Sequence, residues 1–257
     1  MKRAKGVLFN DMRKFCVEIQ FNGKNYYGFQ FLSGKKTIQG EVEKALFKLF
    51  GQEISINGCG RTDAGVSAES YYFDFSADTK LPTNRIPFKL NRFLPKDIQA
   101  QSAKEVDAKF NARYSAKSKT YAYRFYISKH IMPLYNPTRY RIEKQLDFSA
   151  MQSAAELFIG KHDFNAFKTP CKDGVSTVRN IFKIDIVKSG NTFDVNFCGD
   201  GFLYNQIRIM AGAVISVGLN EMSLEEIKVL LSSGKNRADN KAVTLPPNAL
   251  VLKGVEY

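Results

Sequence analysis

The 257-residue sequence contains only two histidines, His130 and His162, and no tryptophan. So few imidazoles exclude a His-rich metal cage or a relay of several imidazoles, and they leave acid–base work to carboxylates or tyrosines. Cysteines are too scarce for a disulfide scaffold, and no Cys-x-x-Cys pair could hold zinc. The cysteines are Cys16, Cys59, Cys171 and Cys198. We expect them to be free, buried thiols in a reducing compartment.

Long apolar runs are missing as well. The longest lies near residues 207–217, and it is too short and too rich in Gly and Ala to span a bilayer. The basic N-terminus returns to Asn10 and Asp11 after three apolar residues, whereas a signal peptide needs a longer apolar core. The sequence therefore predicts a cytoplasmic protein that does not enter a membrane.

Nucleotide and zinc motifs are also absent. No G-x-x-x-x-G-K loop occurs, and the pairs Gly58/Gly60 and Gly199/Gly201 lack the third glycine of a dinucleotide fingerprint. There is no H-E-x-x-H and no cysteine and histidine set of the zinc deaminase type. These absences disfavour nucleotide-driven and metal-assisted chemistry.

Positive charge is abundant and concentrated. The net charge is +13, and residues 80–144 hold 15 Lys and Arg but only 4 Asp and Glu. Such a basic stretch predicts binding to phosphates that weakens with salt. Aromatic residues that bases could stack on lie within it. They are Tyr114, Tyr121, Tyr123, Phe125, Tyr126, Tyr135 and Tyr140. The alternative is that the basic residues form a solvated face and the aromatic residues point into the core. The alternation over 120–127 predicts a core position for some of these aromatic residues.

Apolar periodicity predicts an α+β protein. Strands are expected over 14–21, 70–76, 98–106, 118–127, 181–188, 192–198 and 250–255, and helices over 38–50, 85–93, 148–159, 202–217 and 223–231. This mixed order favours antiparallel or mixed sheets flanked by helices over a doubly wound parallel sheet. We expect two similarly built lobes, residues 1–110 and 111–257, with a cleft between them.

The most unusual segment is Asn57–Ala68, NGCGRTDAGVSA. Its glycines permit positive φ and close approach of another backbone, and they bracket an Arg-Thr-Asp triplet. Arg61 and Asp63 are two residues apart, so an extended segment projects them to the same side. Without further context, a surface turn in which Asp63 caps the backbone and pairs with Arg61 explains the segment equally well.

The run Gly60–Val66 closely resembles the signature of the TruA family of tRNA pseudouridine synthases. Further segments resemble that family in the same order along nearly the whole chain. They are Tyr26–Gln30 (YYGFQ), Leu90–Pro95 (LNRFLP), Phe110–Ala116 (FNARYSA), Lys119–Tyr123 (KTYAY), Asp163–Phe164, Val178–Asn180 and Gly201–Arg208. Each match is weak by itself, but their order and spacing make the resemblance specific.

The resemblance implies an isomerase that turns uridine into pseudouridine in tRNA with one carboxylate and neither cofactor nor metal. Asp63 matches the essential aspartate, which acts either as a nucleophile at C1′ or as a base at C2′. Arg208 matches the arginine that pairs with it, and that arginine is expected to lower its pKa. Arg61 matches the residue that fills the space of the flipped nucleotide, and Tyr121 the residue that stacks on the base and relays a proton. Phosphate contacts are expected from Arg113, Lys119 and Arg179. A homodimer is also implied.

Three departures concern the target rather than the reaction. Ser67 stands where the family often has His, Tyr204-Asn205 replaces a frequent His pair, and Phe29 replaces a frequent Trp. The compact length favours the bacterial type, which acts on positions 38–40 of the anticodon arm. The alternatives are an enzyme for other tRNA positions and a non-catalytic tRNA-binding or folding module.

Overall fold

The computed structural model describes residues 12–170, 174, 176–232 and 234–257, so Cys171 lies outside the described residues. The strands are β1 (Met12–Phe21), β2 (Asn57–Gly58), β3 (Ser67–Asp78), β4 (Ile98–Glu105), β5 (Ser118–Ile127), β6 (Tyr140–Ile142), β7 (Gly160–Asp163), β8 (Val178–Ser189), β9 (Thr192–Gly199) and β10 (Leu250–Glu256). The helices are α1 (Ile38–Phe50), α2 (Ile86–Leu90), α3 (Phe148–Glu156), α4 (Gln206–Gly218) and α5 (Leu224–Leu231).

Local sequence signals set the helix ends. The Thr37 side chain caps α1 by accepting a hydrogen bond from the Gly40 amide, and α5 begins with a reciprocal Ser223–Glu226 capping box. Helix α4 begins four residues later than expected, because Asn205 adopts a left-handed conformation with φ 61° immediately before it. No helix of the described part is long and apolar enough to cross a membrane.

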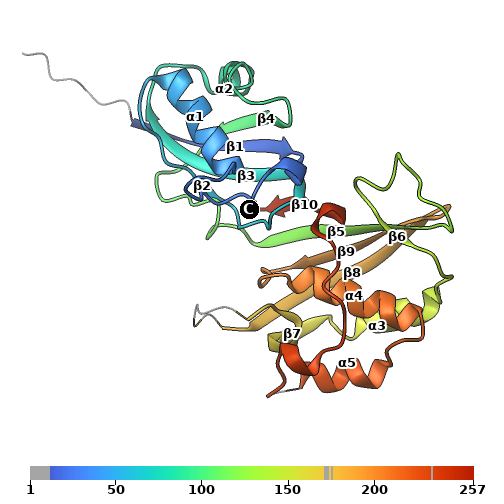
Figure 1. Ribbon diagram of the computed structural model, residues 1–257. Coiled ribbons are helices and arrows are strands. Elements are labelled where there is room, and N and C mark those ends of the chain that lie inside the picture. Colours follow the sequence, from blue (N-terminus) through green and yellow to red (C-terminus); the bar gives the residue numbers. More distant parts are fainter. Residues whose placement is uncertain (1–11, 171–173, 175, 233) are drawn as a thin grey trace, which may run out of the picture.

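The expected α+β architecture is present, with helices α1 and α2 on one lobe and α3 to α5 on the other (Figure 1). The two lobes share one sheet of ten strands in the order β4-β1-β3-β10-β5-β9-β8-β7, with β2 on β3 and β6 on β5. The C-terminal strand β10 makes this continuity, because it pairs parallel with β3 and antiparallel with β5. The division at residue 110 stays a prediction.

One face of the sheet is apolar across both lobes. Directly paired residues of neighbouring strands lie on the same face. The chain of pairs Phe21–Ala68–Leu252–Tyr121–Phe197 therefore crosses the sheet on one face, and all five side chains are buried. The substrate-binding candidate Tyr121 thus belongs to the buried face, next to the strand that joins the lobes.

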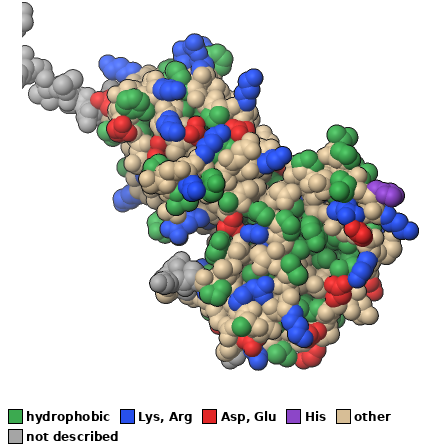
Figure 2. Space-filling model, in the orientation of Figure 1, with side chains coloured by type: hydrophobic (Ala, Val, Ile, Leu, Met, Phe, Trp, Pro, Cys, Tyr) green, Lys and Arg blue, Asp and Glu red, His purple; other side chains and the backbone are tan. Residues whose placement is uncertain are grey.

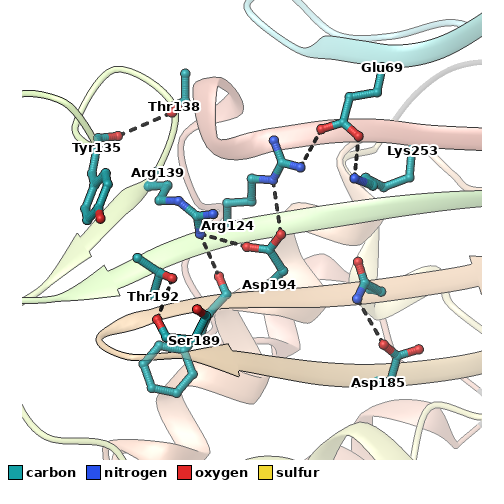
Figure 3. A network of polar contacts seen from close by, with 12 residues as sticks. Glu69, Arg124, Tyr135, Thr138, Arg139, Asp185, Ser189, Thr192, Asp194 and Lys253 are labelled. Atoms are coloured by element: carbon teal, nitrogen blue, oxygen red, sulfur yellow. Dashed lines mark hydrogen bonds and ion pairs between the residues drawn. The ribbon is translucent and has the colours of Figure 1, made fainter.

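The opposite face carries a network of ion pairs (Figure 3). Arg124 on β5 pairs with Glu69 on β3 at 2.5 Å and with Asp194 on β9 at 3.3 Å, while Lys253 on β10 also pairs with Glu69. Arg139 joins Asp194 at 2.7 Å. Burial raises the pKa of Glu69, but hydrogen bonds from Lys253 and Arg124 outweigh it and lower that pKa overall. The network therefore ties four strands on both sides of the lobe junction.

Candidate active site

The segment that carries Asp63 is seated on the aromatic core of the first lobe. Phe29 and Tyr71 stack with ring centroids 4.4 Å apart, and the Tyr71 hydroxyl donates to the Gly60 carbonyl at 2.5 Å. A Cβ at Gly58 would lie 2.2 Å from the Tyr71 hydroxyl oxygen, so only glycine fits there. The Phe29 amide donates to the Thr62 carbonyl at 3.2 Å. The loop is thus fixed on both sides of Arg61.

Asp63 and Arg208 meet across the two lobes. Their closest atoms, Asp63 Oδ2 and Arg208 Nη1, are 3.5 Å apart. The Asp63 side chain is 25% exposed and that of Arg208 14% exposed, so the pair is sheltered but still accessible to a ligand. This proximity supports the pairing expected from the sequence and disfavours a simple surface turn.

The protonation of Asp63 differs from the expectation. Burial raises the pKa of the carboxyl group, and the charge and hydrogen bond of Arg208 lower it only in part, so the pKa is raised overall. The sequence predicted a lowered pKa because it shows the arginine and not the desolvation. Folding takes the Asp63 carboxylate partly out of water, and Arg208 limits the rise in pKa that this burial causes.

The guanidinium of Arg208 is held from several directions. Its Nε donates to the Leu245 carbonyl at 2.6 Å, and Nη1 donates to the Asn205 Oδ1 at 2.6 Å. Asn205 is itself fixed by a 2.8 Å hydrogen bond from Nδ2 to the Thr169 hydroxyl. Asn205 is one of the two residues that depart from the family's His pair, and here it orients the arginine that faces Asp63.

Gly212 makes the support of Arg208 testable. A Cβ at Gly212 in α4 would lie 2.2 Å from the Val243 carbonyl oxygen, two residues before Leu245. We expect Gly212→Ala to push this segment away, lowering the free energy of unfolding by about 1–3 kcal/mol and reducing turnover. Thermal unfolding and activity assays check this. Gly254→Ala, where a Cβ would meet nothing within 4 Å, is the control. Equal behaviour of both variants would contradict this account.

Tyr121 lies in the same buried region as the pair. It is 6% exposed, and the Phe202 ring meets it edge-on at a centroid distance of 5.5 Å. Burial, with smaller effects of Cys59 and Asp63, raises the pKa of the Tyr121 phenol. The side chain is therefore a neutral phenol at neutral pH, suited to contacting a base and able to accept a proton only while passing on its own.

The basic stretch is partly neutralised by folding. Arg124, Arg139, Arg141 and Lys144 all form ion pairs with acidic side chains. In contrast, Arg61, Arg113 and Lys119 form no ion pair with any residue that the structure describes. The Lys119 ammonium lies beside Gly60, and burial, with the charge of Arg113, lowers its pKa although Cys59 opposes this. Arg61, Arg113 and Lys119 thus bring positive charge without an acidic partner to the Asp63 loop.

Arg179 is placed differently. Its guanidinium donates to the Ser176 and Val178 carbonyls at 2.8 and 2.6 Å, so much of its hydrogen-bonding capacity is used locally. It also lies near Gly201, beside the Phe202 that contacts Tyr121. Arg179 is thus on the second-lobe side of the site, without a direct contact to the Asp63–Arg208 pair.

Several site residues escaped the sequence reasoning. Asn205, Phe202 and the Leu245 carbonyl all contact Arg208 or Tyr121. A usable signal existed for Asn205, since asparagine tolerates the left-handed conformation that opens a helix. No signal existed for Leu245, which acts through its backbone from a segment 37 residues away.

Comparison with known proteins identifies a family for nearly the whole chain. The family model described as "tRNA pseudouridine synthase" matches residues 18–115 and 154–257. A tRNA pseudouridine synthase A from Ruminiclostridium cellulolyticum is 37% identical over 247 residues, which are 96% of this chain and 100% of that protein. One from Caldicellulosiruptor bescii is 37% identical over 246 residues, again 96% and 100%.

Solved structures overlay more loosely. In the crystal structure of a Cbf5-Nop10-Gar1 complex, one chain is 13% identical with a TM-score of 0.33, covering 79% of this chain and 54% of that one. The extent of the family match and the near-complete coverage of these relatives are sufficient to assign the chain to a family. The chain belongs to the tRNA pseudouridine synthase family, whose members are isomerases acting on tRNA.

Proposed function

We propose that the protein converts uridine to pseudouridine at positions 38–40 of the tRNA anticodon arm, with Asp63 as its single catalytic carboxylate. The observation that carries this proposal is the Asp63–Arg208 pair, which joins the signature loop of one lobe to α4 of the other at 3.5 Å. The neighbouring cations that lack acidic partners support a polyanionic ligand at the same place.

Either of two routes uses the ionised form of Asp63. As a nucleophile, a carboxylate oxygen bonds to C1′ while N1 leaves with the bonding pair; C5 then attacks C1′, displacing the carboxylate. As a base, the carboxylate takes the C2′ proton while N1 leaves, and the proton returns to C2′ when C5 bonds to C1′. Both routes end with loss of the C5 proton and protonation of N1.

The target uridine must leave its stack to reach Asp63, which costs a few kcal/mol of unstacking. In our proposal the exposed Arg61 occupies the space that the nucleotide vacates. The neutral Tyr121 ring then packs against the flipped base, and its hydroxyl passes on the C5 proton only as it releases its own. Arg179 contacts a phosphate from the second lobe.

The phosphate contacts give a prediction on salt dependence. Arg113→Gln removes one cation that has no acidic partner among the described residues. We expect tRNA affinity to weaken and the slope of log affinity against log salt to fall in magnitude by about 1. Binding titrations at several salt concentrations measure this. Arg141→Gln, which removes an arginine already paired with Glu143 at 2.5 Å, is the control. An unchanged slope for Arg113→Gln would mean that Arg113 does not contact a phosphate.

We also propose that the protein is a homodimer acting in the cytoplasm, where its tRNA substrate is found. One subunit would hold the target nucleotide while its partner supports the tRNA body. Light scattering of the protein with and without tRNA tests this, and a monomer under both conditions would contradict it.

The reaction itself is tested by tritium release from tRNA labelled at uridine C5. Sequencing of carbodiimide-treated tRNA from a strain lacking the gene then locates the modified sites. We expect wild-type protein to release tritium and the deletion strain to lack pseudouridine at positions 38–40. If the protein releases tritium but the deletion strain lacks pseudouridine at other tRNA positions, the reaction stands and only the proposed positions 38–40 are wrong. Tight tRNA binding without any release would favour the non-catalytic binding module instead.

A further inference from the structure

A hollow of about 230 Å³ opens beside the Asp63 loop on the first lobe. Residues from four separate segments line it, among them Gln30, Asn57, Gly60, Arg61, Arg113 and Tyr114. Asp63, Arg208 and Tyr121 are not among its lining residues. The hollow is thus a neighbour of the proposed catalytic site, and it shares Arg61 with that site.

A buried carboxylate fixes two walls of the hollow. Asp74 on β3 is fully buried and accepts hydrogen bonds from the Ala112 amide at 2.6 Å and from Asn57 Nδ2 at 3.0 Å. Its charge is balanced by Lys14 at 3.3 Å. Because the side-chain nitrogen of Asn57 donates to Asp74, the group that Asn57 offers to a ligand is its side-chain carbonyl oxygen, an acceptor. The walls are therefore held before any ligand arrives.

The wall held through Ala112 presents an aromatic ring and a cation together. The Asn111 side chain accepts hydrogen bonds from the Arg113 and Tyr114 amides at 2.9 and 3.1 Å, which shapes the turn. The Arg113 guanidinium lies 5.5 Å from the centre of the Tyr114 ring, and Tyr114 is 79% exposed. This exposure leaves ring surface available for stacking.

We propose that this hollow is a subsite for a second nucleotide of the RNA, whose base stacks on Tyr114 while its phosphate lies between Arg113 and Arg61. The side-chain oxygen of Asn57 and the side-chain amide of Gln30 then face the edge of that base. A stacking ring beside cations without acidic partners is the arrangement that binds single-stranded nucleotides. The inference rests on the proposed function and extends it, since it gives the enzyme a contact beyond the flipped uridine.

Fluorescent RNA tests the subsite. RNA stem–loops in which each loop position in turn carries 2-aminopurine are titrated with wild-type protein, Tyr114→Ala and Tyr114→Phe. We expect one position to be quenched by wild type and by Tyr114→Phe but not by Tyr114→Ala. Since base–aromatic stacking is substantial, Tyr114→Ala should also bind the RNA about tenfold more weakly. Phe88→Ala, which removes another exposed ring (63%) on α2, is the control and should behave as wild type.

The outcomes separate this inference from the proposed function. If wild type releases tritium from tRNA but no position depends on Tyr114, the subsite is refuted and the reaction stands. If the quenching depends on Tyr114 while wild type releases no tritium, the subsite stands as a binding site and the enzymatic proposal fails. An equal loss of quenching in Tyr114→Phe would also refute stacking, because the ring is retained in that variant.

Discussion

Asp63→Asn should lower the rate of tritium release by at least about 10³-fold, while tRNA affinity stays within a few-fold of wild type. The amide keeps the shape of the side chain but can neither attack C1′ nor take a proton from C2′. Affinity should be retained because the cations that we propose as phosphate contacts are separate side chains. Single-turnover release and binding titrations measure the two effects, with Asp78→Asn at the exposed end of β3 as the control.

The same substitution has an expected effect on stability. The raised pKa of Asp63 means that its ionised form costs folding free energy at neutral pH, a cost that disappears as pH falls below the folded-state pKa. Asp63→Asn removes this cost, so its unfolding temperature should equal or exceed that of wild type. A lower unfolding temperature together with lost tRNA binding would mean that Asp63 holds the fold rather than performs the chemistry.

Arg208→Ala should lower turnover by about 10- to 100-fold, the effect of losing one charge-assisted contact to the reacting group. It should also change the pH dependence. Arg208 supplies both effects that lower the pKa of Asp63, whereas burial remains in the variant. The acid limb of the rate profile should therefore move to higher pH.

Arg208→Lys separates charge from geometry. It keeps a cation near Asp63 but cannot reproduce the contacts of the guanidinium with both Asn205 and Leu245. We expect its acid limb to lie nearer to wild type than that of Arg208→Ala, while its turnover stays reduced. Reduced stability alone would not shift the acid limb, so an unshifted limb in Arg208→Ala would argue that the arginine does not act on Asp63.

Local features were predictable from the sequence where local chemistry determines them. The Thr37 cap, the Ser223–Glu226 capping box and the strand Ser118–Ile127 follow from short patterns, and the structure has all three. The proximity of Asp63 and Arg208 followed from the family resemblance, because 145 positions of chain separate them. No periodicity could have joined them.

Properties that depend on long-range packing were not predictable. The insertion of β10 between β3 and β5 joins the lobes into one sheet, and its apolar pattern fits any central strand. The net charge of residues 80–144 overstated the cationic surface, because Arg124 and Arg139 are neutralised by acids from β3 and β9. Desolvation of Asp63 likewise exists only after the loop is seated on Phe29 and Tyr71.

The most direct test of the central claim is a structure of the protein bound to an anticodon stem–loop with 5-fluorouridine at the target position, since fluorine cannot leave C5 as a proton does. The account predicts a flipped nucleotide whose sugar C1′ and C2′ lie against the Asp63 carboxylate, with the base on Tyr121 and Arg208 still beside Asp63. A target nucleotide bound elsewhere, with Asp63 remote from its sugar, would contradict it.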